Sequence, residues 1–322
     1  MQATDIYDIL IVGAGPTGLA CALEARKRGL SHIVLDKGTL VNTIVGYPTQ
    51  MTFFSTPERL ELGEMPFTSP NVRPTRVEAI EYYRGVARRG GLNLALHNRV
   101  LGAERIDDVF HVRAERGEYA ARNLVIATGY FDNTNRLNIP GEDLPKVSHY
   151  YREPFVHYDQ DVLVIGGRNS AVEAALDLYR HGARVTMIHR GDAFGSGLKY
   201  WVRPDIENRI AAGEIIMHWR TELEEIRPES VLLRAATGER LELPNDAVYA
   251  MIGYRPDVSL LAACGVRYDP VTLIPEHDPR TFETNVPGLY IAGSVACGCK
   301  TWEIFIENGR EHAGIIVGEI AS

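Results

Sequence analysis

The stretch that decides the fold runs from Tyr7 to Asp36 and reads YDILIVGAGPTGLACALEARKRGLSHIVLD. The apolar run over residues 7–12 predicts a buried strand, and the spacing of apolar residues over 19–28 predicts a helix after it. Apolar and β-branched residues over 32–35 predict a second strand. Two strands joined by a helix are typical of the unit that builds a parallel sheet, so we expect an α/β fold.

A glycine turn joins the first strand to the helix. Gly13, Gly15 and Gly18 have the spacing that lets a backbone turn tightly and approach a pyrophosphate. The helix that follows presents free N–H groups to the same anion. Asp36 ends the second strand, where a carboxylate can accept hydrogen bonds from ribose hydroxyls. The pattern predicts a nucleotide site; the alternative is a structural turn with Asp36 in solvent.

The same pattern occurs a second time, over residues 161–190, which read DVLVIGGRNSAVEAALDLYRHGARVTMIHR. An apolar strand again runs into a glycine turn, a helix and another strand. The distance from Gly13 to Asp36 equals that from Gly166 to His189. We therefore interpret the chain as containing two Rossmann-like dinucleotide-binding units.

The second unit departs from the first at two places. Arg168 takes the position of the middle glycine, so either the pyrophosphate binds more loosely or the guanidinium adds a phosphate contact. His189 and Arg190 replace the acid at the strand end, and cations suit a 2′-phosphate where a carboxylate does not. This favours NADPH over NADH in the second unit and FAD in the first; the alternative is that Arg190 is only a surface cation.

Three further apolar strands stop at a glycine, over 124–129, 248–253 and 289–293. A glycine there lets backbone approach a ligand. Because one such strand precedes the second unit and another follows it, we expect one domain to be inserted in the other. The predicted domains are an FAD-binding domain of residues 1–128 and 257–322 and an NADPH-binding domain of residues 129–256.

Composition narrows the class of protein. The chain has 322 residues and a net charge of −8, which argues against nucleic acid or an anionic membrane as a partner. The four cysteines form no disulfide framework and no zinc-like CxxC pairs, so we expect no metal site. No apolar run approaches the ~18 residues that span a bilayer, and no secretion signal is recognisable. We expect a cytoplasmic protein.

Several stretches match a known family. In this order, they resemble the low-molecular-weight thioredoxin reductases: GAGPTG (13–18), IATG (126–129), GGRNSA (166–171) and YIAG (290–293). Longer stretches resemble one branch of it, the YpdA-type bacillithiol disulfide reductases: YPTQMTFFSTPERLELGEMPF (47–67), RPTRVEAIEYYR (73–84), LKYWVRPDIENRI (198–210), AMIGYRPD (250–257) and IFIENGREHAG (304–314).

The resemblance implies a homodimeric flavoprotein that passes a hydride from NADPH to FAD and then electrons to a small thiol disulfide. By motif, the residues expected at FAD are Gly13, Gly15, Pro16, Thr17, Gly18, Asp36, Lys37, Thr49, Thr52, Ser55, Val100, Thr128, Gly129, Gly293 and Ser294. Those expected at NADPH are Gly166, Gly167, Arg168, Asn169, Ser170, His189, Arg190 and Gly253.

The cysteines depart from the family. Thioredoxin reductases carry a CxxC in the NADPH domain, and this chain has none. Many YpdA-type members have a cysteine where Thr17 stands, and a threonine cannot form a mixed disulfide. We predict Cys297 and Cys299 as the redox-active thiols, because the segment after Gly293 is expected near the flavin. The alternative is that both are small residues packed beneath the cofactor.

Two other functions stay open at this point. A thioredoxin-reductase-like ferredoxin or flavodoxin–NADP reductase would use the same cofactors and pass electrons to a small redox protein. A flavin-bound NADPH sensor would turn over slowly with every acceptor. Both of these functions are favoured by the absence of a CxxC and by the threonine at position 17. The YpdA-like stretches favour the disulfide reductase.

Overall fold

The strand β1 (Ile6–Val12) lies inside a seven-stranded sheet, because the apolar side chains of Ile9–Val12 are buried on both of its faces. The strands lie in the order β3 (Leu94–Ala95), β2 (His32–Leu35), β1, β6 (Gly117–Ile126), β5 (Val109–Ala114) and β4 (Val100–Ile106), and β15 (Leu289–Ile291) also pairs with β6. Five of the strands are parallel to one another: β3, β2, β1, β6 and β15. An antiparallel meander is formed by β4, β5 and the first half of β6.

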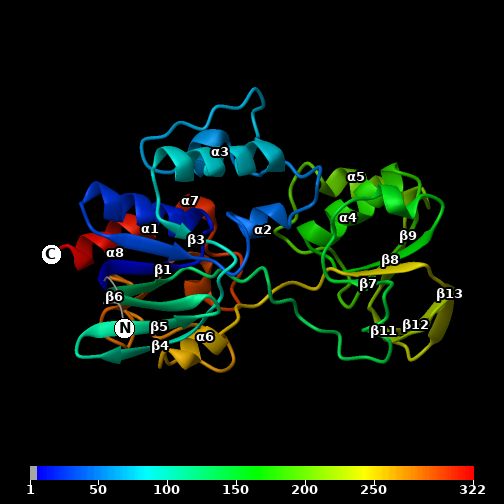
Figure 1. Cartoon of the computed structure of the whole chain (residues 1–322). Helices are drawn as coiled ribbons and strands as arrows, with labels where there is room; N and C mark the ends of the chain where they lie inside the picture. The colour runs from blue at the N-terminus through cyan, green and yellow to red at the C-terminus, as the bar shows by residue number, and fades with distance from the viewer. Residues whose placement is uncertain (1–5) are drawn as a thin grey trace. The chain divides into compact units, whose positions relative to one another are not determined.

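Helices cover this sheet (Figure 1). α1 (Pro16–Lys27) packs against α8 (His312–Ile320). α3 (Arg76–Arg89) begins at a capping box, in which Thr75 and Glu78 each accept a backbone hydrogen bond from the other. The shorter elements are α2 (Asn42–Val45), α6 (Ser259–Ala263), α7 (Ile306–Gly309) and the 3₁₀ helices η1 (Pro57–Leu60) and η3 (Gly293–Cys297).

A second sheet is parallel throughout. Its order is β10 (Ile216–Trp219), β9 (Arg184–His189), β8 (Asp161–Ile165), β14 (Ala247–Ala250) and β7 (Val147–Ser148). α4 (Asn169–Arg180), α5 (Arg203–Ala211) and η2 (Phe155–His157) accompany it, as does an antiparallel sheet of β11 (Thr221–Ile226), β12 (Ser230–Ala235) and β13 (Arg240–Pro244).

The continuous apolar run of β8 has a physical reason. Val162 and Val164 pack in a core with α4 and α5, whereas Leu163 and Ile165 pack in another core with β11 and β12. Alternate side chains of a strand point to opposite faces, so a strand covered on both faces is apolar at every position.

The structure, a computed structural model, describes residues 6–322 and divides into two compact units. Unit 1 comprises Met1–Gly46, Met51–Asn133 and Tyr254–Ser322, and unit 2 comprises Tyr47–Gln50 and Thr134–Gly253. Residues 129–133 and 254–256, which the sequence assigned to the inserted domain, belong to unit 1, where the Phe131 and Tyr254 rings lie 4.8 Å apart.

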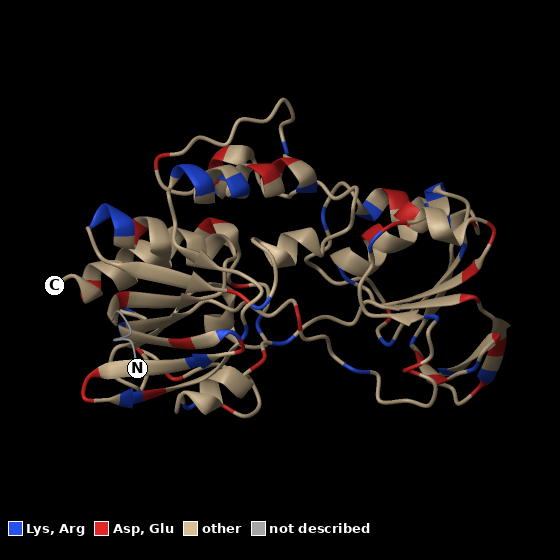
Figure 2. Ribbon diagram, in the orientation of Figure 1, with Lys and Arg blue, Asp and Glu red and all other residues tan. Residues whose placement is uncertain are grey.

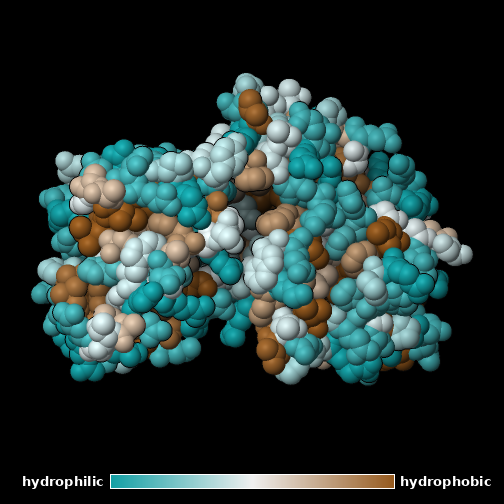
Figure 3. Space-filling view, turned by 180° about the vertical axis from the view of Figure 1, so that it is seen from behind, coloured by the Kyte–Doolittle hydropathy of each residue, from teal (hydrophilic) through white to brown (hydrophobic). Residues whose placement is uncertain are grey.

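Both predicted strand–helix–strand units are confirmed, as β1–α1–β2 in unit 1 and β8–α4–β9 in unit 2. Lys, Arg, Asp and Glu are interspersed over the ribbons of both units, without an extended region of one sign (Figure 2). The face in Figure 3 is mostly hydrophilic, with small separate apolar groups. Within residues 6–322 no helix combines the length and apolarity needed to cross a bilayer.

Candidate functional site

The carboxyl ends of four parallel strands meet at one edge of the unit 1 sheet. Val12 pairs with both Leu35 and Ile126, and Ile126 pairs with Ile291. The Gly13 N–H donates to the Leu35 carbonyl over 2.7 Å. The turn after β1 therefore lies beside the residues that follow β2, β6 and β15, at the edge where α/β sheets bind ligands.

The backbone requires two of the three glycines in the first turn. Gly13 has φ +114°, and a Cβ there would lie 2.4 Å from the Ala127 carbonyl oxygen. A Cβ on Gly18 would lie 1.9 Å from the Gly13 carbonyl oxygen. Gly15 has φ −76°, and a Cβ would meet nothing within 4 Å. Gly15 thus faces open space at the start of α1. The first N–H groups of α1 have no partner within the helix and can bind an anion.

Asp36 is tied to this turn by the backbone. Its Oδ2 accepts from the Ala14 N–H and its Oδ1 from the Gly38 N–H, each over 2.7 Å. Burial raises the pKa of Asp36. Lys37 pairs instead with Asp132, with 3.0 Å between Nζ and Oδ2. The Asp36 carboxyl group is therefore fixed beside the glycine turn and is not a solvated strand end.

The segment after β15 packs directly on the same turn. Gly293 has φ +72°, and a Cβ there would lie 2.8 Å from Thr17 Oγ1. A Cβ on Gly309 of α7 would lie 3.2 Å from the same Oγ1. Thr17 is therefore enclosed between two glycines. The Gly293 N–H donates to His312 Nδ1 over 3.2 Å, and the His312 ring stacks on Phe282 at 4.0 Å.

Sequence reasoning missed His312. Its imidazole is buried, and that burial lowers the pKa of His312 to about 4. The ring is therefore neutral near pH 7, with Nδ1 as the acceptor. The only sequence signal was a polar residue at the start of an apolar C-terminal helix, which by itself assigns no partner.

The stretch expected near the flavin divides between the units. Buried Ser55 donates a hydrogen bond to Glu307 Oε1, in the first turn of α7. Thr52, three residues earlier, forms an isolated bridge with Thr75 in unit 1. Thr49 belongs to unit 2, where its N–H and Oγ1 both donate to the Arg152 carbonyl.

The remaining residues expected at FAD lie along the edge of unit 1. Gly129, after Thr128, has φ +69°, and a Cβ there would lie 3.6 Å from Ser294 Oγ. The Asn98 N–H donates to the Asp36 carbonyl over 2.8 Å, and buried Val100 begins β4 two residues later. Apart from Thr49, the residues expected at FAD all belong to unit 1.

Cys297 and Cys299 are free thiols in unit 1. Cys297 is buried, its Sγ donates to the Ser294 carbonyl over 3.1 Å, and burial raises its pKa. Cys299 is partly exposed, and its N–H donates to the Thr272 carbonyl. A buried thiol with a raised pKa is a poor nucleophile. The redox role of the pair stays a prediction, and Cys297 has the features of a packed side chain.

The turn of unit 2 explains how an arginine replaces a glycine. Gly166 has φ +139°, and a Cβ there would lie 2.6 Å from the Met251 carbonyl oxygen, so glycine is required. Arg168 has φ −112° and ψ −179°, extended backbone that any residue adopts. It occupies the same place before α4 as Gly15 before α1. The arginine therefore causes no backbone strain.

Three basic side chains gather at this turn. The His189 ring lies over Gly167, where a Cβ would be 2.8 Å from Nε2. Burial lowers the pKa of His189, and the charges of Arg190 and Arg168 lower it further. Arg168 and Arg190 are exposed, and both lie close enough to His189 to act on it. Both guanidinium groups therefore lie at the surface beside the turn.

The other residues expected at NADPH lie in unit 2 as well. Gly253, after β14, has φ +91°, and its carbonyl accepts from the Asn135 N–H over 3.0 Å. Ser170 is exposed in the first turn of α4. The side chain of Asn169 is hydrogen-bonded to a neighbouring segment.

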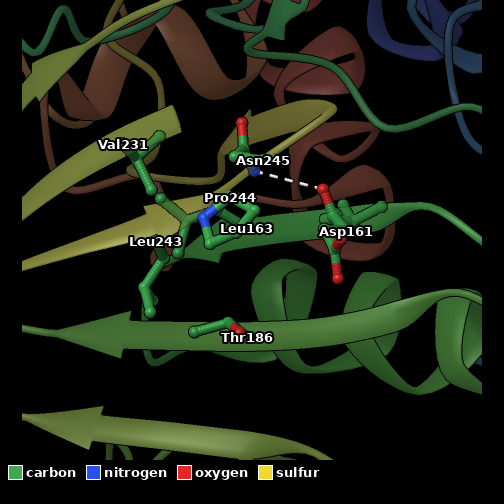
Figure 4. A pocket seen from close by; sticks show the side chains of 8 residues that line it. Asp161, Leu163, Thr186, Val231, Leu243, Pro244 and Asn245 are labelled. Atoms are coloured by element: carbon green, nitrogen blue, oxygen red, sulfur yellow. Dashed lines mark hydrogen bonds between the residues drawn. The ribbon is translucent and has the colours of Figure 1, made fainter. Parts of the chain in front are cut away.

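A separate pocket in unit 2 lies away from the turn (Figure 4). Its lining includes Asp161 and Leu163, at the amino-terminal end of β8, together with Leu243 and Asn245. The glycine turn follows the opposite, carboxyl end of that strand. Among the described residues, no group of three or more His, Cys, Asp or Glu could hold a metal ion.

Comparison with known proteins identifies the family. Residues 10–293 match the family described as pyridine nucleotide-disulphide oxidoreductase. The chain belongs to this family. Membership implies a flavin and a nicotinamide nucleotide as cofactors. The predicted enzyme class, a flavoprotein disulfide reductase, is confirmed.

Relatives support the predicted branch of the family. Bacilliredoxin reductase Bdr of Bacillus subtilis (strain 168) is 41% identical over 313 residues, 97% of each chain. The structure of bacillithiol disulfide reductase Bdr (YpdA) from Bacillus cereus is 41% identical, with a TM-score of 0.96 over 98% of this chain and 99% of that one. The Bdr (YpdA) structure from Staphylococcus aureus is 36% identical, with a TM-score of 0.94 and 98% of each chain covered. The predicted resemblance is therefore confirmed.

Proposed function

We propose that the chain is an FAD-containing, NADPH-dependent reductase of bacillithiol disulfide or a similarly small disulfide. The observation that carries this proposal is the pair of nucleotide turns with opposite charge. The unit 1 pattern ends at a carboxyl group, Asp36, which suits ribose hydroxyls. The unit 2 pattern ends at His189 and Arg190, which suit a 2′-phosphate, and Arg168 in its turn adds a cation for the pyrophosphate. The relatives named Bdr support the choice of disulfide.

When both cofactors are bound, NADPH supplies a hydride and the flavin passes two electrons to the disulfide, so that one disulfide, one NADPH and one proton give two thiols and NADP⁺. The residues of unit 1 would hold FAD at the edge formed by Gly13, Gly15 and Gly293. Ser55 and Glu307 join two segments of that edge and keep the first turn of α7 in place.

The test is an anaerobic assay of the purified protein. The bound flavin is identified after extraction, NADPH and NADH are compared as donors, and oxidised bacillithiol is then added. We expect FAD, faster flavin reduction by NADPH than by NADH, and consumption of one NADPH per disulfide. Bleaching of the flavin with no response to the disulfide would contradict the proposed substrate.

A second acceptor belongs in the same assay. A ferredoxin–NADP reductase from Ignicoccus hospitalis is 27% identical over 89% of this chain and 90% of its own. Rapid NADPH-dependent reduction of a ferredoxin, without turnover of the disulfide, would favour the one-electron alternative. Slow turnover with both acceptors would favour a sensor.

We also propose a homodimer, as the resemblance implies. Sedimentation velocity on the flavin-loaded protein tests it, and a species of 35.8 kDa at micromolar concentration would contradict it.

A further inference from the structure

Asn169 is the first residue of α4 and directly follows the turn Gly166–Arg168. Its position in the motif suggested a contact with pyrophosphate. Both ends of its side-chain amide are already engaged, because Oδ1 accepts from the Lys199 N–H over 2.8 Å and Nδ2 donates to the Gly197 carbonyl over 3.0 Å. These bonds reach a segment about thirty residues further along the chain.

That segment, residues 191–199 or GDAFGSGLK, is here called the strap. It starts immediately after Arg190 and returns to the amino end of α4. Three of its nine residues are glycines, which leave a backbone with little conformational preference of its own. Its geometry therefore depends on the bonds that tie it to the rest of unit 2.

Other contacts also hold the strap, among them the Arg220 N–H, which donates to the Gly191 carbonyl over 2.9 Å. The Gly195 N–H donates to the Gly167 carbonyl over 3.1 Å, and Arg203 of α5 donates to the Gly195 carbonyl over 2.9 Å. Lys199 Nζ pairs with Glu173 of α4. Phe194 is buried against Trp219, with ring centroids 4.8 Å apart. Three of these contacts reach the nucleotide turn or the residue that follows it: the two from Asn169 and the one to Gly167.

We infer that Asn169 is a positioning residue: its amide holds the strap against the nucleotide turn of unit 2, and it acts on the nucleotide through the strap. The inference rests on the proposed NADPH site. The strap borders that site from Arg190, at the 2′-phosphate end, to Lys199, beside the helix that faces the pyrophosphate. A strap ordered before binding leaves less conformational entropy to be lost when the nucleotide binds.

The first test needs no nucleotide. Amide hydrogen exchange is compared in the wild type, in Asn169→Ala and in Asn208→Ala, a matched control on the exposed side of α5. We expect the Gly195 and Lys199 amides to exchange at least about tenfold faster in Asn169→Ala only, because two hydrogen bonds to the strap are lost. Unchanged exchange of the strap in Asn169→Ala would overturn the inference.

The second test measures binding of NADP⁺ and NAD⁺ by calorimetry. Asn169→Ala should weaken NADP⁺ binding roughly tenfold and lower the preference for NADP⁺ over NAD⁺, since the strap starts immediately after Arg190. Arg203→Met loosens the strap from α5 and should reproduce both effects, which a phosphate-ligand role for Asn169 does not predict. Normal NADP⁺ binding by Arg203→Met with weakened binding by Asn169→Ala would overturn the inference. If the wild type binds no NADP⁺, the proposed cofactor fails, whereas the exchange result still decides the strap.

Discussion

Gly15 and Arg168 occupy equivalent places in their two turns, and both have a negative φ with extended ψ. Glycine is thus not required by the backbone at either place, and the difference between the turns is one of charge. Arg168, immediately before α4, adds a cation where a phosphate would approach.

Replacing Arg168 by glycine decides between the two interpretations of this position. We expect Arg168→Gly to raise the Kd for NADP⁺ about fivefold to tenfold, because a charge-assisted hydrogen bond is worth about 1 kcal/mol or more even when exposed. Calorimetry at two salt concentrations measures the effect and its screening. Tighter binding by the variant would show that the arginine only obstructs the turn.

Cys297 and Cys299 can be tested together. Because Cys297 is buried and burial raises its pKa, the structure favours the alternative to a redox role, in which these residues are small packed side chains. On that alternative we expect the Cys297→Ser/Cys299→Ser variant to keep disulfide turnover within about threefold of the wild type. The measurement is NADPH consumption with oxidised bacillithiol under anaerobic conditions. Loss of turnover with normal flavin reduction by NADPH would instead establish these thiols as the redox pair.

His312 makes stability depend on pH. Its pKa of about 4 lies below the ordinary value of 6.5, so between these pH values the unfolded chain binds a proton that the folded chain does not. The stabilising contribution is complete above about pH 6.5 and falls by about 3 kcal/mol as the pH drops to 4.

The corresponding variant is His312→Gln. The free energy of unfolding, measured by denaturant between pH 4 and 7, should fall less steeply on acidification in His312→Gln than in the wild type. His32, His149 and His189 also have pKa values lowered by burial, and they contribute equally to both proteins. If the free energy of unfolding depends on pH equally steeply in the two proteins, a group other than His312 determines that dependence.

At the scale of elements, the loop between β6 and β7 is organised by one buried carboxylate. Glu142 accepts from the Leu137 N–H over 2.7 Å and from the Asn138 N–H over 2.8 Å, and Arg136 lies 3.2 Å away. His149 Nε2 is also 3.2 Å from Glu142 but outside hydrogen-bond geometry. The carboxylate thus satisfies backbone donors that the loop leaves unpaired.

Neutralising this group should destabilise unit 2. In Glu142→Gln one acceptor oxygen becomes a donor facing a backbone N–H, and we expect a loss of about 2–3 kcal/mol in the free energy of unfolding. Denaturant unfolding measures it, with exposed Glu239→Gln as the matched control. Equal stability of the two variants would mean that the loop rearranges without cost.

At the scale of the whole molecule, the unfolding of each unit can be followed by its own tryptophan residues. Trp201 and Trp219 belong to unit 2, and Trp302, the third tryptophan of the chain, belongs to unit 1. Tryptophan fluorescence of Trp302→Phe therefore follows only unit 2. NADP⁺ at 100 times its Kd should stabilise that transition by about 2.7 kcal/mol. Stabilisation by free FAD and not by NADP⁺ would contradict the assignment of NADPH to unit 2.

The sequence by itself determined the two strand–turn–helix–strand units, the strands that precede Gly129, Gly253 and Gly293, and the family. The strands end two or three residues before these glycines, at Ile126, Ala250 and Ile291. These features are local, because a strand's period, a helix's spacing and a glycine's φ are properties of short stretches. The positions of Gly13 and Gly166 were predictable for this reason.

Only the tertiary structure decided which distant residues meet. Ser55 and Glu307 lie 252 residues apart in sequence and are hydrogen-bonded. His312 accepts a hydrogen bond from the Gly293 N–H. The Asn169 side chain is hydrogen-bonded to the strap. No pattern encodes such pairs, because they depend on how sheets bring remote loops to one edge. Burial of Cys297 likewise follows from packing, and packing sets whether a thiol is reactive.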